Sequence, residues 1–354
     1  MNFFFQVNIL QPEIQSGKQP GPNDALALLS VGPVAFRQGE ALGFTPNRPG
    51  NPDLKPETGT EIELGFDASL FENRLGIELT WFDKRTEDAI VARPDAFSLG
   101  FPGNRFVNVG EIKNSGFEIV LDGDVIRSDA FGLQLRGTLA TLDNEVTDLP
   151  EPIPFGAQRH QEGLPFAAYW DAPVTIDANG DVVVADEKEF LGQPTPTREG
   201  TLSTTLDFFD WVTVYALFDY KGGHKLFDGT EELNCALIQC PAIFEVGPDG
   251  EPTDEARRKL DGVFVGTVEP FLYDADFVKL RTVSLRLHVP SRLVGSLGAE
   301  AASLTISGDN LVTWTDFPGT DPEANFAGSN QVIRQEFIGM PQMPRFTARL
   351  SLTY

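Results

Sequence analysis

Histidine and cysteine, the residues that most often ligate metals or act in catalysis, are few and widely spaced in this 354-residue chain. The histidines are His160, His224 and His288, and none has a partner at a metal-ligand spacing such as HExxH. His288 alternates with Arg286 along an amphipathic run, which predicts a water-facing strand position. The chain has no glycine-rich phosphate loop, and abundant carboxylates in an acidic protein do not indicate a catalytic pair. The sequence therefore predicts no enzyme and no cofactor.

The two cysteines, Cys235 and Cys240, lie in one segment with the sequence CALIQC. In an oxidising compartment this spacing allows a small disulfide ring, which we expect here. Two thiols alone are too few for a structural zinc site. The cysteines are therefore interpreted as a disulfide candidate and not as metal ligands.

The segment Asp177–Asp181, DANGD, superficially resembles a calcium loop because acidic and amide side chains alternate along it. However, Val182 stands where an EF-hand requires glycine, and Lys188 stands at the position of the bidentate glutamate. A β-turn at this point is the favoured interpretation. Weak binding of a divalent cation remains an open alternative.

Aromatic side chains in predicted loops are the candidates for ligand contact, because their flat faces can stack on a sugar or a peptide. These candidates are Tyr169, Trp170, Trp314 and Phe317. The favoured alternative is burial within packed loops or a place in the aromatic belt at a membrane interface.

The elements that would carry these loops are strands with a period of two. Apolar residues alternate with polar and acidic residues from Ile62 to Leu70, and a second run from Leu75 to Trp81 follows a tight turn. A slip of one residue would move the acidic residues onto the apolar face, so the register is strongly specified. Similar runs are predicted at Ser115–Asp122, Phe131–Leu142, Leu202–Phe208, Val212–Tyr220, Val283–Val289, Leu304–Gly308 and Phe346–Tyr354.

The connections between these strands alternate between short and long. The long ones are predicted at Arg85–Glu111, Asn144–Arg198, Lys221–Ala275 and Thr313–Met343. A transmembrane barrel places short turns on the periplasmic side and long loops outside, whereas a soluble sandwich has no reason to do so. The apolar faces carry no charged residue, although charged residues make up 22% of the chain. We therefore predict an all-β protein, an antiparallel transmembrane β-barrel with a polar interior.

Composition limits the partners and the mode of membrane insertion. The chain has 52 acidic and 27 basic residues, a net charge of -25, which argues against binding nucleic acid. No apolar run approaches the roughly 18 to 20 residues of a transmembrane helix. The N-terminal MNFFFQVNIL lacks a basic region and a cleavage site, so we do not interpret it as a secretion signal.

Two regions are expected. Residues 1–56 should hold a strand stub followed by a long extracellular loop from residue 11, because Pro, Gly and Asn are frequent there. Residues 57–354 should form the barrel portion, with nine strands, or ten if the stub is included.

Several segments, in the same order as in the family, resemble the barrel domain of TonB-dependent outer-membrane receptors. They are NPDLKPETGTEIELGF, WFDKRTEDAI and NVGEIKNSGFEI. Two later segments, DFVKLRTVSLRLHVP and SGDNLVTWTDFPGTDPE, are similar to the SusC/RagA-type branch. The resemblance covers Asn51 to Tyr354. Family members also have a plug domain and about 22 strands, so this chain is expected to be the C-terminal nine to ten strands of a larger barrel, without the plug.

This resemblance implies a function in the bacterial outer membrane. The whole receptor would import a nutrient too large for porins, an oligosaccharide or a peptide in preference to a siderophore. Its implied partners are the plug and earlier barrel strands, the TonB complex, a SusD-like surface lipoprotein and outer-membrane lipid. Two alternatives remain open, namely a passive outer-membrane channel and a secreted soluble β protein that binds glycans.

The last strand ends on an aromatic residue and resembles the C-terminal signal by which outer-membrane barrels are recognised for insertion. The residues of this signal are Phe346, Leu350, Leu352 and Tyr354. A chance amphipathic terminal strand is the alternative.

Deletion of Arg345–Tyr354 should abolish membrane assembly, because it removes the proposed recognition signal. The measurement is the amount of protein recovered in the outer-membrane fraction. An unchanged yield after the deletion would count heavily against a barrel.

Overall fold

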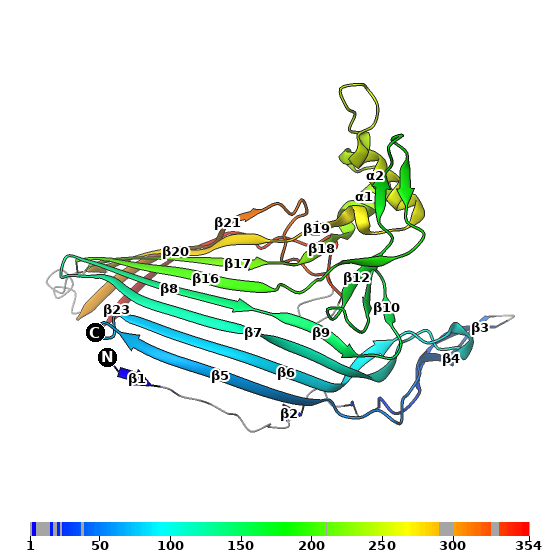
Figure 1. Ribbon diagram of the computed structural model, residues 1–354, viewed down its shortest axis with the longest axis horizontal. Coiled ribbons are helices and arrows are strands. Elements are labelled where there is room, and N and C mark those ends of the chain that lie inside the picture. Colours follow the sequence, from blue (N-terminus) through cyan, green and yellow to red (C-terminus); the bar gives the residue numbers. More distant parts are fainter. Residues whose placement is uncertain are drawn as a thin grey trace.

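The computed structural model describes residues 2–4, 15–16, 20–21, 23–36, 39–209, 211–289, 300–326 and 333–353. One large antiparallel sheet forms a curved wall, and a smaller unit of short strands and helices stands at one end of it (Figure 1). The wall consists of β1 (Asn2–Phe4), β5 (Thr58–Leu70), β6 (Leu75–Arg93), β7 (Arg105–Arg127), β8 (Phe131–Thr141), β16 (Arg198–Phe208), β17 (Val212–Gly222), β20 (Phe277–Val289), β21 (Ala301–Thr315) and β23 (Arg345–Thr353), in that spatial order.

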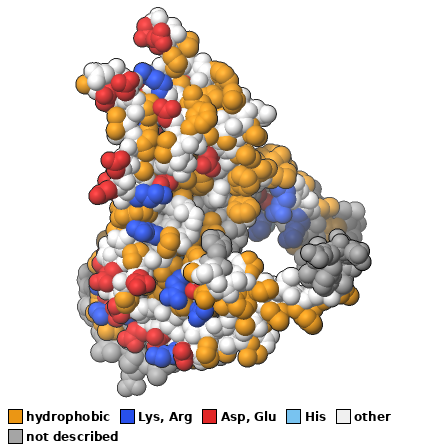
Figure 2. Space-filling view, turned by 90° about the vertical axis from the view of Figure 1, so that its right-hand side faces the viewer, with side chains coloured by type: hydrophobic (Ala, Val, Ile, Leu, Met, Phe, Trp, Pro, Cys, Tyr) orange, Lys and Arg blue, Asp and Glu red, His pale blue; other side chains and the backbone are white. Residues whose placement is uncertain are grey.

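This wall confirms the predicted fold class and the strand count, nine strands plus the N-terminal stub. Two further strands extend the sheet, since β2 (Gln15–Ser16) pairs with β5 and β9 (Asp143–Asp148) pairs with β7. The wall curves around a hollow, as Figure 2 shows from the end that carries the smaller unit. The described strands therefore form a section of a barrel wall.

The register gathers the predicted apolar faces on one side of the wall. Leu64 lies opposite Trp81, and Trp81 lies opposite Phe117 on the next strand. Leu285 likewise lies between Val214 and Ile306. Opposed residues of an antiparallel pair share a face, so these side chains form one continuous outer band. Leu64 and Phe117 are almost half exposed, which is the pattern expected where lipid is the solvent.

The opposite side of the wall is polar, as predicted. Asp122 lies opposite Arg136, with 3.8 Å between carboxylate and guanidinium, and Arg286 lies opposite Thr305. Thr138 and Thr201 share a hydrogen bond of 2.7 Å across β8 and β16. A hydrated lumen is the environment in which such a face is stable.

The predicted long loop at Arg85–Glu111 is wrong, because β6 and β7 remain paired as far as Arg93 and Arg105. The reason lies in the residues of β6 and β7 beyond the outer apolar band. Asp83 shares its face with Ile62, yet it forms an ion pair with Lys113 at 3.2 Å. Above the lipid a charged side chain can face outward, and farther along β6 Ala89, Ile90 and Val91 are all buried, so the sequence loses its period of two while the backbone pairing continues. The 23 residues of β7 span about 75 Å, more than a membrane requires.

The other predicted loops also contain regular structure. Residues 11–56 include a hairpin of β3 (Leu28–Phe36) and β4 (Gly39–Arg48), so the expectation of a continuous loop there is wrong. The segments after β9 and β17 fold into short elements. These are β10 (Ile153–Phe155), β11 (Gln158–His160), β12 (Ala168–Asp171), β13 (Val174–Ile176), β14 (Val182–Val184), β15 (Glu189–Gly192), β18 (Lys225–Asp228), α1 (Gly229–Ala236), α2 (Asp254–Val265), β19 (Leu272–Asp274) and the later β22 (Gln335–Glu336).

We call residues 153–192 and 225–274 the outer unit. Two helices were not expected there, and both have clear ends. Asp228 caps α1 through the Glu231 amide, and Thr253 caps α2, which ends at Gly266 in the left-handed conformation, with φ of 80°. No helix of the described chain is long and apolar enough to cross a membrane.

The outer unit has its own core. Tyr169 and Phe271 are fully buried, and Cys235 and Cys240 are 1% exposed in the same cluster. A separate cluster around Val109 and Val146 packs where β6, β7 and β9 rise above the outer band. The protein therefore combines a one-layer wall, which needs lipid on its outer face, with a conventionally packed outer unit.

Candidate functional site

A cavity of about 650 Å³ lies where four wall strands meet the base of the outer unit. Arg198 begins β16, Gly223 follows β17, Asp276 precedes β20 and Asp316 follows β21, so all four strands contribute to it. The remaining lining residues are Pro165, Phe190, Gly192, Gln193, His224, Lys225 and Asp274. Because its walls come from distant parts of the sequence, only the fold could assemble it.

The lining of this cavity is polar and carries both signs of charge. Lys225 lies 3.9 Å from Asp274, and Asp276 accepts a hydrogen bond of 2.7 Å from the Gly223 amide. Phe190 is 41% exposed and offers an aromatic face. Hydroxyl or amide groups of a ligand can hydrogen-bond to such a lining while an apolar face stacks on the phenylalanine. The cavity suits a polar organic ligand such as a sugar or a peptide.

His224 is a buried group of this cavity, with 8% of its surface exposed. Burial lowers the pKa of His224 to about 4, although nearby Asp276 acts in the opposite direction. The imidazole is therefore neutral at neutral pH. Its Nδ1 has no hydrogen-bond partner within the described part of the chain, which leaves one polar atom available for a ligand or water.

A network of ion pairs lies on the inner face of the wall next to β21. Lys279 is 3% exposed, and its Nζ lies 2.7 Å from both Asp321 and Glu323. Arg281 lies 2.6 Å from Glu323 and also binds Asp219 on β17. The segment after β21 is thus anchored to the wall by two cations, each of which contacts two carboxylates.

A β-bulge explains how Arg281 reaches this network. The register of β20 shifts between Leu280 and Thr282, so Arg281 is an extra residue opposite β17, whereas on β21 Asn310 and Leu311 lie opposite it. A bulge re-aims a side chain and increases the local twist. Burial alone would raise the pKa of Glu323, but hydrogen bonds from Arg281 and Lys279 lower it. Glu323 is therefore charged when the segment is docked.

Two of the four predicted loop aromatics are buried in packed structure. Tyr169 is fully buried, and its hydroxyl donates to the Arg334 carbonyl at 2.6 Å. Burial raises the pKa of Tyr169. Phe317 is 4% exposed and packs with Leu226 and Ala275. Neither side chain offers a face to a ligand in this arrangement.

The other two aromatics lie apart from each other. Trp170 carries Arg159 over its ring at 4.4 Å. Trp314 is on the outer face, opposite Val278, and stacks on Phe218 with ring centroids 6.4 Å apart. This position suits the aromatic belt at the membrane interface better than contact with a ligand. The structure does not gather the four aromatics into one site, and Phe190, which the sequence analysis missed, is the aromatic residue of the cavity.

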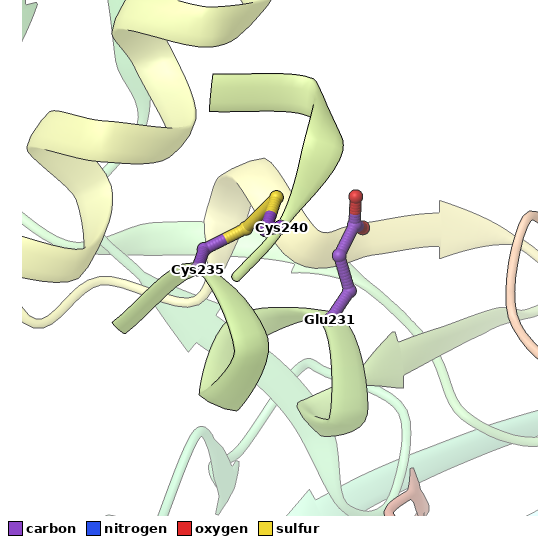
Figure 3. A group of neighbouring side chains, drawn as sticks. All are labelled: Glu231, Cys235 and Cys240. Atoms are coloured by element: carbon purple, nitrogen blue, oxygen red, sulfur yellow. A yellow bond between two sulfur atoms is a disulfide. The ribbon is translucent and has the colours of Figure 1, made fainter. Parts of the chain in front are cut away.

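Cys235 and Cys240 are joined by a disulfide in the structure, with Cα atoms 4.5 Å apart. The Glu231 carboxylate lies within 4.8 Å of both sulfur atoms (Figure 3). It is already occupied, because Lys259 contacts it at 2.7 Å and the Tyr273 hydroxyl donates to it at 2.6 Å. Burial would lower the pKa of Lys259, but the hydrogen bond to Glu231 raises it. With its sulfur atoms bonded, this group does not fit a metal.

The turn at Asp177 has the conformation predicted for it. Asp177 Oδ1 accepts hydrogen bonds from the amides of Asn179 and Asp181, at 2.8 and 2.9 Å. These bonds lower the pKa of Asp177. The turn joins β13 to β14, and the aspartate side chain stabilises it.

His160 has a structural role that the sequence did not reveal. It is 2% exposed, stacks on the ring of Phe166, contacts the ring of Phe155, and accepts a hydrogen bond from the Ala167 amide at 3.3 Å. Burial lowers the pKa of His160 to about 4. A neutral, stacked imidazole of this kind belongs to the core of the outer unit. His288 lies on the polar face of β20, opposite Ser303.

The C-terminal strand β23 places its apolar residues on the outer face. Phe346 lies opposite Gly308, Leu350 opposite Leu304, and Leu352 opposite Ala302. Tyr354 lies outside the described residues. The role of these residues in assembly stays a prediction.

Comparison with known proteins decides the family. Residues 18–230 match the family model described as "TonB dependent receptor-like, beta-barrel". This chain belongs to that family. It is therefore a section of an outer-membrane receptor barrel, as the sequence motifs indicated.

Curated relatives carry the same designation. The chain is 25% identical over 358 residues to TonB-dependent receptor P3 of Formosa agariphila, covering 86% of this chain and 35% of the relative. It is 26% identical over 339 residues to TonB-dependent receptor P26 of the same organism, covering 83% and 34%. The chain thus spans about a third of the length of the curated relatives it matches.

Solved structures share the fold of the chain. The RagAB peptide transporter superposes with a TM-score of 0.74 at 21% identity, over 93% of this chain and 38% of the solved chain. The RagAB peptide importer in the "open-open" state gives a TM-score of 0.70 at 21% identity. The chain therefore shares the barrel fold of the RagAB proteins over nearly its whole length.

Replacement of Lys279 by Met should release the segment after β21, because Asp321 and Glu323 would lose a cation in a buried setting. We expect a local cost on the order of 3 kcal/mol, measured as faster amide hydrogen exchange in residues 316–326. The matched control is Arg345→Met, which breaks the exposed ion pair to Asp309 and should cost less than about 1 kcal/mol. Equal effects of the two substitutions would contradict a structural role for the network.

Proposed function

We propose that this chain forms the C-terminal wall, lumen lining and extracellular surface of a receptor that imports a large nutrient across the outer membrane with energy delivered through TonB. The observation that carries this proposal is the family match over residues 18–230. The polar inner face and the mixed-charge cavity at the mouth agree with transport of a polar molecule. The chain performs no covalent chemistry.

The substrate is an oligosaccharide or a peptide in preference to a ferric siderophore. Support comes from the cavity lining, where Asp274, Asp276 and Lys225 can hydrogen-bond to hydroxyl or amide groups and Phe190 can stack. The similar RagAB proteins are described as peptide transporters, which favours the same kind of cargo here.

The partners follow from the same family. A plug domain and earlier strands complete the barrel, TonB supplies the energy, and a SusD-like surface lipoprotein covers the mouth. The chain spans about a third of its relatives, which leaves room in a receptor of their length for the plug and the remaining strands. The outer unit and the β3–β4 hairpin are the surfaces that a lipoprotein partner would contact.

The two alternatives predict different behaviour. A passive channel would share the wall but would not depend on TonB. A secreted soluble β protein would need its apolar faces covered, whereas the outer band leaves Leu64 and Phe117 almost half exposed. The soluble alternative is therefore disfavoured.

Uptake of fluorescent oligosaccharides, peptides and ferric siderophores by cells that express the receptor tests the proposal. Uptake of one of the first two classes should require TonB, and Phe190→Ala should weaken it by several-fold because a stacking face is lost. Phe326→Ala, which removes an exposed aromatic outside the cavity lining, is the matched control and should have no effect. Uptake that persists without TonB would identify a passive channel.

A further inference from the structure

Two buried carboxylates face each other where the outer unit meets the chain that follows β21. β22 runs parallel to β18, and Glu336 lies opposite Asp228 in this pair. Asp228 is 4% exposed and Glu336 is fully buried. Like charges opposite each other on neighbouring strands destabilise a sheet unless a cation or a proton neutralises them. The pair of Asp228 and Glu336 therefore needs a cation or a proton between the two carboxylates.

Backbone amides satisfy only one oxygen of each carboxylate. The Glu231 amide donates to Asp228 Oδ1 at 2.8 Å, and the Gly339 amide donates to Glu336 Oε1 at 3.1 Å. Glu336 Oε2 has no hydrogen-bond partner among the residues that the structure describes. Lys259, a basic side chain of the same unit, is committed to Glu231 at 2.7 Å. A fully buried carboxylate oxygen without a partner is costly, and a cation bound between the two carboxylates would remove that cost.

Both carboxylates line a cavity of about 320 Å³. Asn234 and Thr320, whose side chains carry oxygen atoms, also line it. A Cβ atom on Gly319 would lie 2.7 Å from Asp228 Oδ2, so glycine allows the backbone to approach this carboxylate. The cavity thus has carboxylate, amide and hydroxyl oxygens around a space large enough for an ion and its water ligands.

We propose that this cavity binds a calcium ion, with Asp228 and Glu336 as its charged ligands. Calcium accepts about six to eight oxygen ligands in flexible geometry, whereas magnesium demands a nearly ideal octahedron. A roomy cavity with irregularly placed oxygens suits calcium. Cys240 also lines the cavity, but its sulfur is bonded to Cys235. A thiolate-seeking metal such as zinc is therefore disfavoured.

A calcium ion here connects three segments that are distant in sequence. Asp228 caps α1, Glu336 belongs to β22, and Pro318–Thr320 lines the cavity directly before Asp321, which binds Lys279. The ion would therefore hold the chain that follows β21 to the outer unit. The ion pairs of Lys279 and Arg281 already hold the same chain to the wall. Calcium binding would make the outer unit and the chain that follows β21 more rigid, and this effect does not depend on the proposed import.

Hydrogen exchange of the full receptor in detergent at neutral pH tests the proposal, with EGTA compared with calcium. Extracellular calcium modules have dissociation constants of about 10⁻⁴ to 10⁻³ M, so about 10 mM calcium should slow exchange roughly 10- to 100-fold. The affected segments are residues 226–240 and 333–343. Titration calorimetry on the same protein should give binding in that range of affinity.

The double variant Asp228→Asn, Glu336→Gln should lose the response to calcium. Asn caps a helix as well as Asp does, and Gln has the shape of Glu. The variant should therefore exchange in EGTA no faster than the wild type, which separates loss of the site from loss of the fold. The matched control, Asp177→Asn, alters the other calcium-like segment and should keep the full response.

Several results would overturn the proposal. They are an absence of any calcium effect in the wild type, an equal effect of magnesium, and a calcium response that survives in the double variant or disappears in Asp177→Asn. Protection that rises on acidification in EGTA, with no response to calcium, would show that a shared proton neutralises the pair instead. Faster exchange of the double variant in EGTA would also count against the site, because removing an unneutralised repulsion should not loosen the fold.

Discussion

The structure depends on one constraint, the pairing of every backbone amide and carbonyl that lies in lipid. Unpaired backbone groups in a bilayer cost several kcal/mol each, so strands cross membranes only in closed sheets. The described wall satisfies this requirement internally from β5 to β21. Its outer strands, β1 and β23, pair on one side only within the described residues. A closed barrel requires partners for these edges, and the relatives are about three times longer than the matched region.

The same constraint divides the protein into parts with different chemistry. Within the bilayer, the outer face is apolar and the inner face is polar, and a Lys or Arg on the outer face would cost about 2 to 4 kcal/mol. Above the bilayer, charge is permitted on both faces, as the ion pair between Asp83 and Lys113 illustrates. The outer unit lies outside the bilayer and does not need an apolar outer face, so it buries its apolar residues in a core around Tyr169 and Phe271. Buried ion pairs, such as those of Lys279 with Asp321 and Glu323, then hold the chain that follows β21 to the wall.

These differences explain what the sequence could predict. All nine strands with lipid on one face and water on the other were located, because apolar and polar residues such as Leu285 and Arg286 alternate along them. The predicted Val283–Val289 and Leu304–Gly308 are nevertheless shorter than β20 and β21. The extensions of β6 and β7 were missed because the alternation disappears there: the charged Asp83 is on the outer face, and Ala89, Ile90 and Val91 are all buried. The β3–β4 hairpin was hidden by frequent Pro and Gly. Helix α2 did have signals, a Thr253 cap, an acidic first turn and a final Gly266, but the helix is too short for strong periodicity.

The functional residues were less predictable for a related reason. The 650 Å³ cavity, the Lys279 network and the pair of Asp228 and Glu336 join residues from distant segments, so no local pattern marks them. The aromatics chosen from the loops could not be sorted into buried, lipid-facing and exposed groups without a fold. Trp314 and Phe317 are three residues apart, yet one faces outward and the other is buried.

Spin labels on β20 in native outer membranes would show directly whether lipid covers one face of the wall and water the other. Labels at Leu285 and Ser284, adjacent residues that point to opposite faces, should differ sharply. We expect that oxygen, which partitions into lipid, relaxes the label at 285, and that a water-soluble nickel complex relaxes the label at 284. Equal access of the nickel complex to both positions would contradict a membrane wall.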